Sequence, residues 1–206
     1  MSRIIVTPPT EYPVSLVEAK AHLRVDLDHE DAEIQQCVAA ATERAEEFRA
    51  EQFCTAVWRL ALDRFPNACE RIGWSEAYPF DRGAIVPPRP PLISVASITY
   101  VDANGATQTL SPSLYQVDAI SRPGRIVPAY GESWPATRSQ PNAVLVQYSA
   151  GYGAASAVPA KIKQAIRLLI GHYYWNREEV ITGTIVSRMP EAAEALLRSN
   201  RILRVA

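Results

Sequence analysis

The clearest pattern of apolar and polar positions lies between residues 158 and 180. Apolar side chains recur there at spacings of three and four, which places them on one broad face of an α-helix. Lys161, Lys163 and Arg167 fall mainly on the opposite side. The apolar positions are Ile162, Ala165, Ile166, Leu169, Ile170, Tyr173 and Tyr174. At about 1.5 Å per residue this helix is roughly 30 Å long, so we expect the rest of the chain to meet its apolar face.

Three more helices are predicted from local signals. Ser15 and Glu18 form a capping box, in which each side chain accepts a hydrogen bond from the other residue's backbone N–H, and a helix over about residues 16–24 follows. A longer helix is predicted over about residues 31–53, and a last short one over residues 189–199. The longer helix has one apolar side, formed by Ile34, Cys37, Val38, Ala41, Ala45 and Phe48. Its polar side is predicted to face solvent and consists of Glu43, Arg44, Glu46, Glu47 and Arg49.

The helical period is lost in the middle of the chain, between residues 55 and 152. Short runs with alternating apolar positions and many of the chain's 16 prolines predict strands and turns there. Asn104 and Gly105 separate the runs 97–101 and 107–110, and an Asn-Gly pair in this position favours a β-hairpin. The segment therefore predicts a β-rich subdomain.

These elements predict an α+β fold, a helical bundle formed by N- and C-terminal segments with a β-rich insertion between them. Residues 1–54 and 153–206 are assigned to a discontinuous helical domain that includes the C-terminal tail. Residues 55–152 are assigned to the β-rich insertion. Within these parts, residues 1–13 are predicted to be an extended arm and residues 64–90 an irregular loop.

Charge and composition narrow the possible functions. The chain has a formal net charge of −1 and a pI of about 6.3, whereas domains that bind nucleic acid through its phosphates usually have a pI above about 9. Tight DNA binding is therefore not expected. No apolar run approaches the roughly 20 residues of a membrane span, and the first residues do not resemble a signal peptide. Cys37, Cys54 and Cys69 are typical of reduced packing residues in a cytosolic protein.

Candidate catalytic and metal-binding residues are few. The histidines are His22, His29 and His172, and none has a metal-ligand spacing to a cysteine or another histidine. The acidic run 26–31 could hold a hard cation, but it lacks the glycine and the distal glutamate of an EF-hand loop, and a solvated helix start is the favoured interpretation. We expect no catalytic residue, no metal site and no cofactor.

Several longer motifs occur in a particular order along the chain. They are PVSLVEAKAHLRVD, PPLISVASITYVDANG, LYQVDAISRPGRIVP, VLVQYSAGYG before VPAKIKQAI, HYYWNRE and MPEAAEALLRSNR. This ordered set resembles the head–tail connector (adaptor) family of long-tailed bacteriophages and phage-derived gene transfer agents. The resemblance spans nearly the whole chain, except for residues 64–86.

The resemblance implies a structural ring subunit without catalysis. Family members form a ring, typically of twelve copies, beneath the portal protein. The ring extends the DNA channel and carries a stopper or tail-terminator protein below it, so the implied location is the neck of a virion or gene-transfer-agent particle, with the bacterial cytoplasm as the site of assembly. A near-neutral chain suits a channel through which DNA slides without tight binding. A closed ring also requires two different contact faces on each subunit.

Two sets of residues are candidate interfaces. Residues 190–206 are predicted to dock on the portal; the alternative is that the last helix caps the bundle and the final residues fray. The end of the long helix is predicted to contact a neighbouring subunit; the alternative is that all its aromatic residues are buried within the monomer. The portal set is Pro190, Leu196, Leu197, Arg198, Arg201, Ile202, Leu203 and Arg204. The subunit set is Tyr173, Tyr174, Trp175 and Arg177.

A second function class stays open at this stage. The β-rich insertion could make the chain a cytosolic ligand- or peptide-binding module, supported by the proline-rich loop and the aromatic residues Trp74, Tyr78 and Phe80. An enzyme is the third alternative. Ring formation with a portal would favour the adaptor, and a monomer with a saturable small ligand would favour the binding module.

Overall fold

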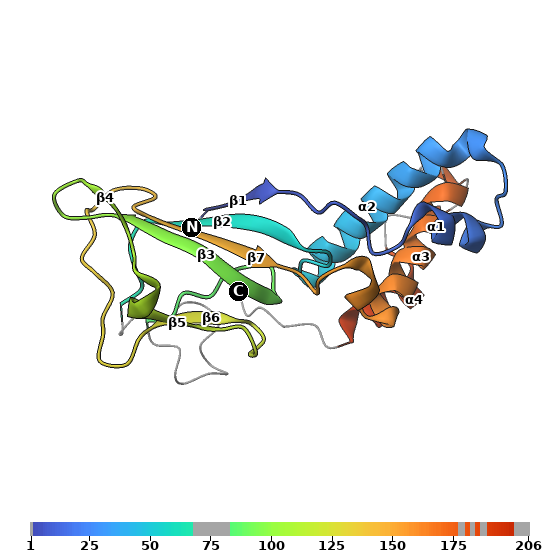
Figure 1. Ribbon diagram of the computed structural model, residues 1–206. Helices are drawn as coiled ribbons and strands as arrows, with labels where there is room; N and C mark the ends of the chain where they lie inside the picture. Colours follow the sequence, from blue (N-terminus) through green and yellow to red (C-terminus); the bar gives the residue numbers. More distant parts are fainter. Residues whose placement is uncertain (1, 68–82, 177–179, 182–183, 186–188, 200–206) are drawn as a thin grey trace. The chain divides into compact units, whose positions relative to one another are not determined.

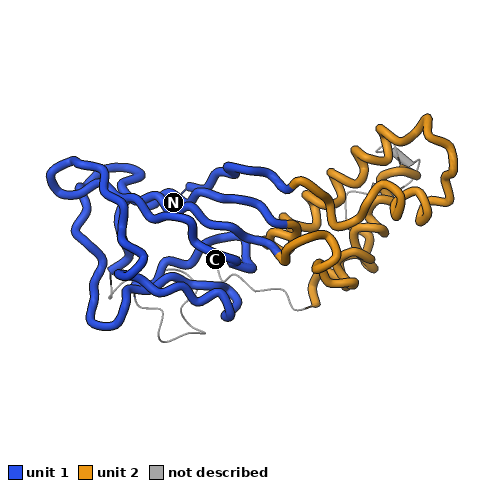
Figure 2. Tube along the Cα trace, in the orientation of Figure 1, with its two compact units in different colours: residues 1–9, 55–151, 202–206 blue, residues 10–54, 152–201 orange. Residues whose placement is uncertain are grey.

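The computed structural model describes residues 2–67, 83–176, 180–181, 184–185 and 189–199. Over these residues the fold is α+β, as predicted. The chain divides into two compact units, each built from separate stretches of sequence (Figure 2). Of the described residues, the β unit contains 2–9, 55–67 and 83–151, and the helical unit contains 10–54, 152–176, 180–181, 184–185 and 189–199.

A five-stranded antiparallel sheet forms the body of the β unit, in the order β1-β2-β7-β3-β4 (Figure 1). The central strand β7 shows the alternation typical of a sheet with one face packed on a core. Val144, Val146, Tyr148 and Ala150 are buried, and the side chains between them are half-buried. The strands are β1 (Ser2–Thr7), β2 (Ala56–Leu62), β3 (Leu92–Val101), β4 (Thr107–Thr109) and β7 (Val144–Ala150).

The core of the β unit lies between this sheet and a second strand pair, β5 (Tyr115–Asp118) and β6 (Arg125–Pro128). Ile126 of β6 is buried, and its backbone exchanges two hydrogen bonds of 2.8 Å with Ile85. The Tyr148 hydroxyl donates to the carbonyl oxygen of Pro88 at 2.6 Å, so the largest core side chain also has its polar end satisfied.

The hairpin predicted at Asn104-Gly105 is confirmed. β3 and β4 pair in register from Val101 opposite Thr107. An Asp102 carboxylate oxygen accepts hydrogen bonds from the backbone N–H groups of Asn104 and Ala106, each at 2.9 Å. Gly105 has a φ of +88°, a conformation that costs glycine little because it has no Cβ.

The helical unit is built around α3, and the predicted apolar face of that helix is buried apart from Tyr173, which is half-buried. Helices α1, α2 and α4 pack with α3 around one core. The capping box at the start of α1 is confirmed, because Ser15 N–H donates to the Glu18 carboxylate at 2.9 Å and Glu18 N–H donates to Ser15 Oγ at 3.2 Å. The helices are α1 (Leu16–Leu23), α2 (Asp31–Arg49), α3 (Ala160–Trp175) and α4 (Glu191–Arg198).

Short elements complete the described part of the chain. Single 3₁₀ turns precede α2, β5 and α3, and a two-stranded pair lies between α3 and α4 in the sequence. The turns are η1 (Asp28–Glu30), η2 (Pro112–Leu114) and η3 (Ala155–Ala157), and the strands are β8 (Val180–Ile181) and β9 (Thr184–Ile185).

Three boundaries differ from the sequence prediction. The first residues are a strand rather than an arm grouped with the helices: β1 pairs with β2 from Ser2 opposite Ala61, and its β-branched residues suit an extended strand. The helix predicted over residues 31–53 ends at Arg49, because Ala50 adopts a left-handed conformation with a φ of +54°. The helix predicted to continue to residue 180 ends at Trp175, where the Asn176 side chain donates to the carbonyl oxygen of His172 at 2.8 Å.

Candidate functional site

The four described residues of the predicted portal set lie on or beside α4. Leu197 is 0% exposed and packs in the core of its own unit, because it follows the buried Ala193 by one helical turn. That residue of the set is therefore not available to a partner. Pro190 and Leu196 are half-buried, and Arg198 is exposed and paired with Glu194 at 2.6 Å. Arg201, Ile202, Leu203 and Arg204 lie outside the described residues.

A buried charged pair holds the end of α4. Arg49 donates from Nη1 to the carbonyl oxygens of Leu197 at 2.6 Å and Ser199 at 2.8 Å. Its Nε and Nη2 atoms each donate to the Glu51 carboxylate at 2.9 Å, and the Tyr152 hydroxyl donates to the same carboxylate at 2.9 Å. Burial acts to lower the pKa of Arg49, but the hydrogen bonds and charge of Glu51 outweigh it and raise that pKa. The guanidinium therefore stays charged.

The predicted subunit set lies at the other end of α3. Tyr174 is buried and its hydroxyl donates to the Glu30 carboxylate. Tyr173 is half-buried, and this desolvation raises the pKa of its hydroxyl. Trp175 is 70% exposed and rests edge-on against the Tyr174 ring, with the ring centroids 5.1 Å apart. Arg177 lies outside the described residues, so Trp175 is the described member of the set with the most free surface.

The two predicted interfaces are separated by the length of α3. Lys161, in the first turn of α3, donates from Nζ to the Ser199 hydroxyl at 3.4 Å. Trp175 is the last residue of the same helix. Fourteen residues of α-helix span about 21 Å, so the end of α4 and the exposed tryptophan are distinct surfaces of the helical unit.

The acidic run before α2 binds a lysine. Lys20 Nζ lies 2.6 Å from Asp28 and 2.7 Å from Asp31. Hydrogen bonding to Asp28, and then to Asp31, raises the pKa of Lys20, and the bond to Lys20 lowers the pKa of Asp28. Among the described residues, no group of three or more His, Cys, Asp or Glu side chains is placed to hold a metal ion.

Neither of the two described cysteines forms a disulfide bond. Cys37 is half-buried, and Cys54 is buried in the core of the helical unit. Desolvation raises the pKa of Cys54 to about 12, which keeps the thiol protonated at neutral pH. Both positions fit a packing role, and Cys69 lies outside the described residues.

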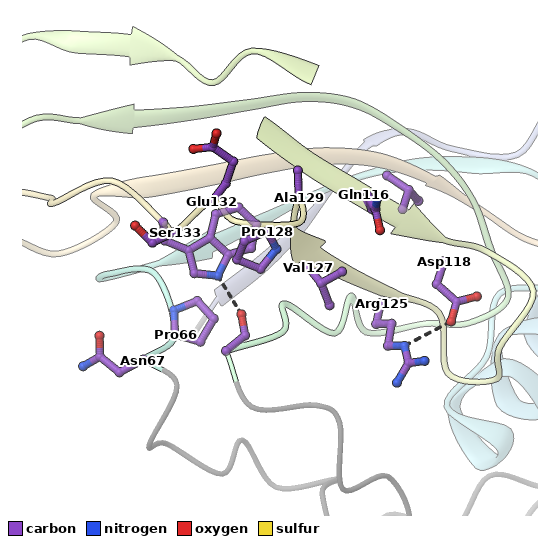
Figure 3. A pocket seen from close by; sticks show the side chains of 13 residues that line it. Pro66, Asn67, Gln116, Asp118, Arg125, Val127, Pro128, Ala129, Glu132 and Ser133 are labelled. Carbon is purple, nitrogen blue, oxygen red and sulfur yellow. Dashed lines mark hydrogen bonds and ion pairs between the residues drawn. The ribbon is translucent and has the colours of Figure 1, made fainter. Parts of the chain in front are cut away.

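The β unit contains an open cavity of about 720 Å³ next to β5 and β6 (Figure 3). Its lining includes Asp118 and Arg125, which form an ion pair at 3.0 Å, and Trp134. The indole N–H of Trp134 donates to the carbonyl oxygen of Gly83 at 2.6 Å, and the ring stacks on Phe65 with centroids 4.9 Å apart. The cavity thus combines an aromatic wall with one charged pair.

Apolar side chains are exposed elsewhere in the β unit. Ile120 is 95% exposed on the turn between β5 and β6, and the Asp118 carboxylate fixes that turn by accepting from the backbone N–H groups of Ile120 and Ser121 at 3.1 and 3.0 Å. On the edge strand β1, Ile4 and Ile5 are both exposed. An apolar edge strand is a surface that proteins usually cover or pair.

Comparison with solved structures finds matches over the full length of the chain. One match is a chain of “Neck of empty GTA particle computed with C6 symmetry”, with a TM-score of 0.74 and 25% identity, covering 100% of this chain and 98% of that chain. The same coverage holds for a chain of “Virion of native gene transfer agent (GTA) particle”, with a TM-score of 0.76 and 24% identity. It also holds for a chain of “Neck of native GTA particle computed with C12 symmetry”, with a TM-score of 0.69 and 24% identity.

The chain shares its fold with a protein of GTA particle necks. No protein-family model and no curated protein matches the sequence. Among the described helices, none has the length and apolar character to cross a membrane.

Sequence reasoning missed the Arg49–Glu51 pair. Arg49 was predicted to face solvent with the polar side of its helix, but its side chain is 4% exposed. A signal was present, because Arg49 follows the buried Ala45 by four residues and so continues the apolar row of α2. Arginine side chains are usually exposed to solvent, which gave the wrong prediction. The position of Arg49 in the apolar row correctly indicates burial.

Proposed function

We propose that this chain is a structural subunit of a particle neck, a head–tail adaptor that forms a ring of twelve copies beneath the portal. The ring extends the DNA channel and joins the capsid to the tail. Its partners are copies of itself, the portal above and a stopper or tail-terminator protein below, and DNA passes through without tight binding. The protein resides in the particle neck and assembles in the bacterial cytoplasm.

One observation carries the proposal. The fold matches a chain of a GTA particle neck from end to end, covering 100% of this chain and 98% of that one at 25% identity. A match of this extent includes both compact units of the chain. The neck described with C12 symmetry supports a twelve-fold ring.

The charge of the chain and the arrangement of the helical unit are consistent with this role. Strongly basic proteins bind DNA tightly because their side chains neutralise phosphates and release counterions. A chain with a net charge of −1 lacks this excess of positive charge, so DNA could slide through a channel that it forms. A closed ring uses a different patch on each side of the subunit. The end of α4 and Trp175 provide two separate surfaces on one unit, and we assign the first to the portal and the second to a neighbouring copy.

The portal contact is testable by a short truncation. Removal of residues 200–206 leaves the buried contacts of Leu197 in place, so the truncated protein should fold with an unchanged thermal midpoint. It should fail to join portal-containing heads, as seen by electron microscopy of the mixture and by sedimentation. Normal joining by the truncated protein would remove the portal contact from the proposal.

The subunit contact is testable at Trp175. Trp175→Ala removes an exposed side chain, so the monomer should keep its stability while ring formation on portal-bearing heads is lost. Tyr130→Ala is the matched control, because Tyr130 is an exposed aromatic residue like Trp175 but belongs to the β unit. Rings that form equally well with Trp175→Ala and with the control would exclude the tryptophan from the subunit interface.

A second candidate function has one observation in its favour. The cavity of about 720 Å³ in the β unit has the size of a small-molecule site, for which about 300–1,000 Å³ is usual. This supports the ligand- or peptide-binding module. Light scattering of the purified protein with a portal separates the two functions: a ring favours the adaptor, and a monomer that binds a small molecule saturably favours the module.

A further inference from the structure

Positive and negative side chains are divided unequally between the two units. In the described part of the β unit the basic side chains are all arginines, seven against four carboxylates. The described part of the helical unit has thirteen carboxylates against eight lysines and arginines. The small net charge of the chain therefore does not mean that each unit is neutral. The seven arginines are Arg3, Arg59, Arg64, Arg89, Arg122, Arg125 and Arg138.

In a closed ring this division favours contacts between unlike units. Each copy meets its two neighbours through two different patches. Patches of opposite charge attract each other as the copies approach, whereas like charges that face each other oppose binding. A contact between the helical unit of one copy and the β unit of the next copy joins patches that differ both in position and in charge.

The end of the helical unit that carries Trp175 combines apolar surface with an exposed carboxylate. The Tyr174 hydroxyl donates to Glu30, which joins the last turn of α3 to η1, and the Trp175 ring rests against the Tyr174 ring. Leu27, the residue before η1, is 64% exposed, and Asp26 beside it is exposed as well. We call Asp26, Leu27 and Trp175 the tryptophan end. Its chemistry suits a partner that brings an apolar side chain together with a cation.

The turn between β5 and β6 presents such a pair of side chains. Ile120 is 95% exposed, and Arg122, two residues further along, is also exposed. The Asp118 carboxylate accepts from the backbone N–H groups of Ile120 and Ser121. It also accepts from the Ser121 hydroxyl at 2.7 Å and from Arg125 Nε at 3.0 Å. Because these bonds fix the turn before it binds, it loses little conformational freedom on binding.

We propose that the β5–β6 turn of one copy binds the tryptophan end of the neighbouring copy, with Ile120 on the apolar surface and Arg122 near Asp26. This inference rests on the proposed ring and identifies the surface that meets Trp175. Arginine suits the position, because a guanidinium can stack on an aromatic ring and can pair with a carboxylate. Tryptophan and arginine are also enriched among the residues that contribute most to protein interfaces.

The test reverses one charge on each side of the contact. Arg122→Glu brings two acidic side chains together in every contact of the ring, and Asp26→Arg brings two basic ones together. Both residues are exposed, so each variant should keep the wild-type thermal midpoint. The readout is the protein concentration at which half of purified portal-bearing heads carry a ring in electron micrographs. Each variant alone should need about tenfold or more protein than the wild type, because like charges then face each other.

An equal mixture of the two variants should restore the ring. A ring of twelve copies allows the two variants to alternate, and each contact then joins one acidic and one basic side chain. The substituted positions 122 and 26 face each other in half of the contacts, and the wild-type Arg122 and Asp26 face each other in the other half. The mixture should therefore assemble within about threefold of the wild-type concentration. A mixture that assembles no better than the single variants would overturn the inference.

Arg138→Glu is the matched control, because Arg138 is an exposed arginine of the β unit outside the β5–β6 turn. Alone it should assemble like the wild type, and mixed with Asp26→Arg it should not restore the ring. Restoration by this control would mean that total charge rather than the turn joins the copies, and would overturn the inference.

The wild type keeps the two proposals apart. A wild-type protein that forms no ring on portal-bearing heads would contradict both the proposed function and this contact. A wild-type ring together with normal assembly of both charge-reversed variants would contradict this contact alone.

Discussion

The two ends of α2 carry ion pairs of similar chemistry in opposite surroundings. At its end, Arg49 and Glu51 are buried together, and Arg49 donates to the main chain of α4. At its start, Lys20 bridges Asp28 and Asp31, and the side chain of Asp28 is 90% exposed. Both clusters have short N–O distances, between 2.6 and 2.9 Å. Distance alone therefore does not distinguish them.

Burial decides what each pair can do. An exposed ion pair contributes little to the free energy of unfolding, because water and salt screen the charges and because both side chains lose conformational freedom when they pair. A buried pair has a different property: neither member can be removed alone without leaving an unpaired charge in a poorly solvated place. The pair at the end of α2 is thus suited to fixing a position, and the pair at its start closes a local turn.

The largest effect is expected from breaking the buried pair. Arg49→Met leaves the Glu51 carboxylate buried without its cation and the end of α4 without its donor, so the free energy of unfolding should fall by about 3–5 kcal/mol. Chemical denaturation monitored by fluorescence would measure the change. Adding Glu51→Met should restore most of the loss, because the uncompensated charge is then gone. Equal stability of the single and double variants would contradict this account of the pair.

A smaller, pH-dependent effect is expected at Asp118, which is partly exposed. Hydrogen bonds from the hydroxyl and the N–H of Ser121, assisted by Arg125, lower the pKa of Asp118 from 3.8 to about 2. Because the pKa of Asp118 is lower in the folded state, the ionised carboxylate stabilises the fold fully above pH 3.8, and this stabilisation is lost as the pH falls through about 2. Asp118→Asn should lower the thermal midpoint at neutral pH. It should also make the midpoint fall less steeply as the pH decreases over that acid range.

The control for Asp118 is Glu132→Gln, which neutralises an exposed carboxylate lining the same cavity. This variant should leave the thermal midpoint at neutral pH unchanged, and the midpoint should decrease in acid as it does in the wild type. If Asp118→Asn behaved like Glu132→Gln, the turn that presents Ile120 would not depend on the charge of Asp118.

Local rules were sufficient for part of the fold. The apolar face of α3 follows from spacing alone, and the capping box at Ser15 and the hairpin at Asn104-Gly105 each involve residues close in sequence. Contacts between distant residues were not predictable in this way. The bond from Arg49 to the Leu197 carbonyl spans 148 positions, and no pattern near either residue specifies the other.

The strand β1 shows a second limit. Half-buried strands are recognised by alternation of apolar and polar residues, but all six residues of β1 are exposed. Its pairing with β2 joins residues that are fifty or more positions apart, so the sequence indicated an extended segment without its partner. For the candidate site, spacing identified the aromatic cluster at the end of α3 but not which ring is exposed, since that depends on the Glu30 partner of Tyr174.

The smallest effect is expected at the exposed ion pairs of Lys20, at the start of α2. Lys20→Met removes the cation shared by Asp28 and Asp31. The pKa of Lys20 is raised above 10.5, so the pair's contribution is present at neutral pH and is lost only as the pH rises through that raised value. Because Asp28 is open to water, the loss should be slight at low salt and vanish near 1 M salt, where the Debye length is about 3 Å. Denaturation of Lys20→Met and Arg49→Met in parallel at both salt concentrations gives the measurement. The free energy of unfolding of the Arg49 variant should stay below that of the wild type in high salt, since buried charges are screened far less. A loss at Lys20 that is as large as the loss at Arg49, or that persists in high salt, would mean that burial is not what separates the two ends of α2.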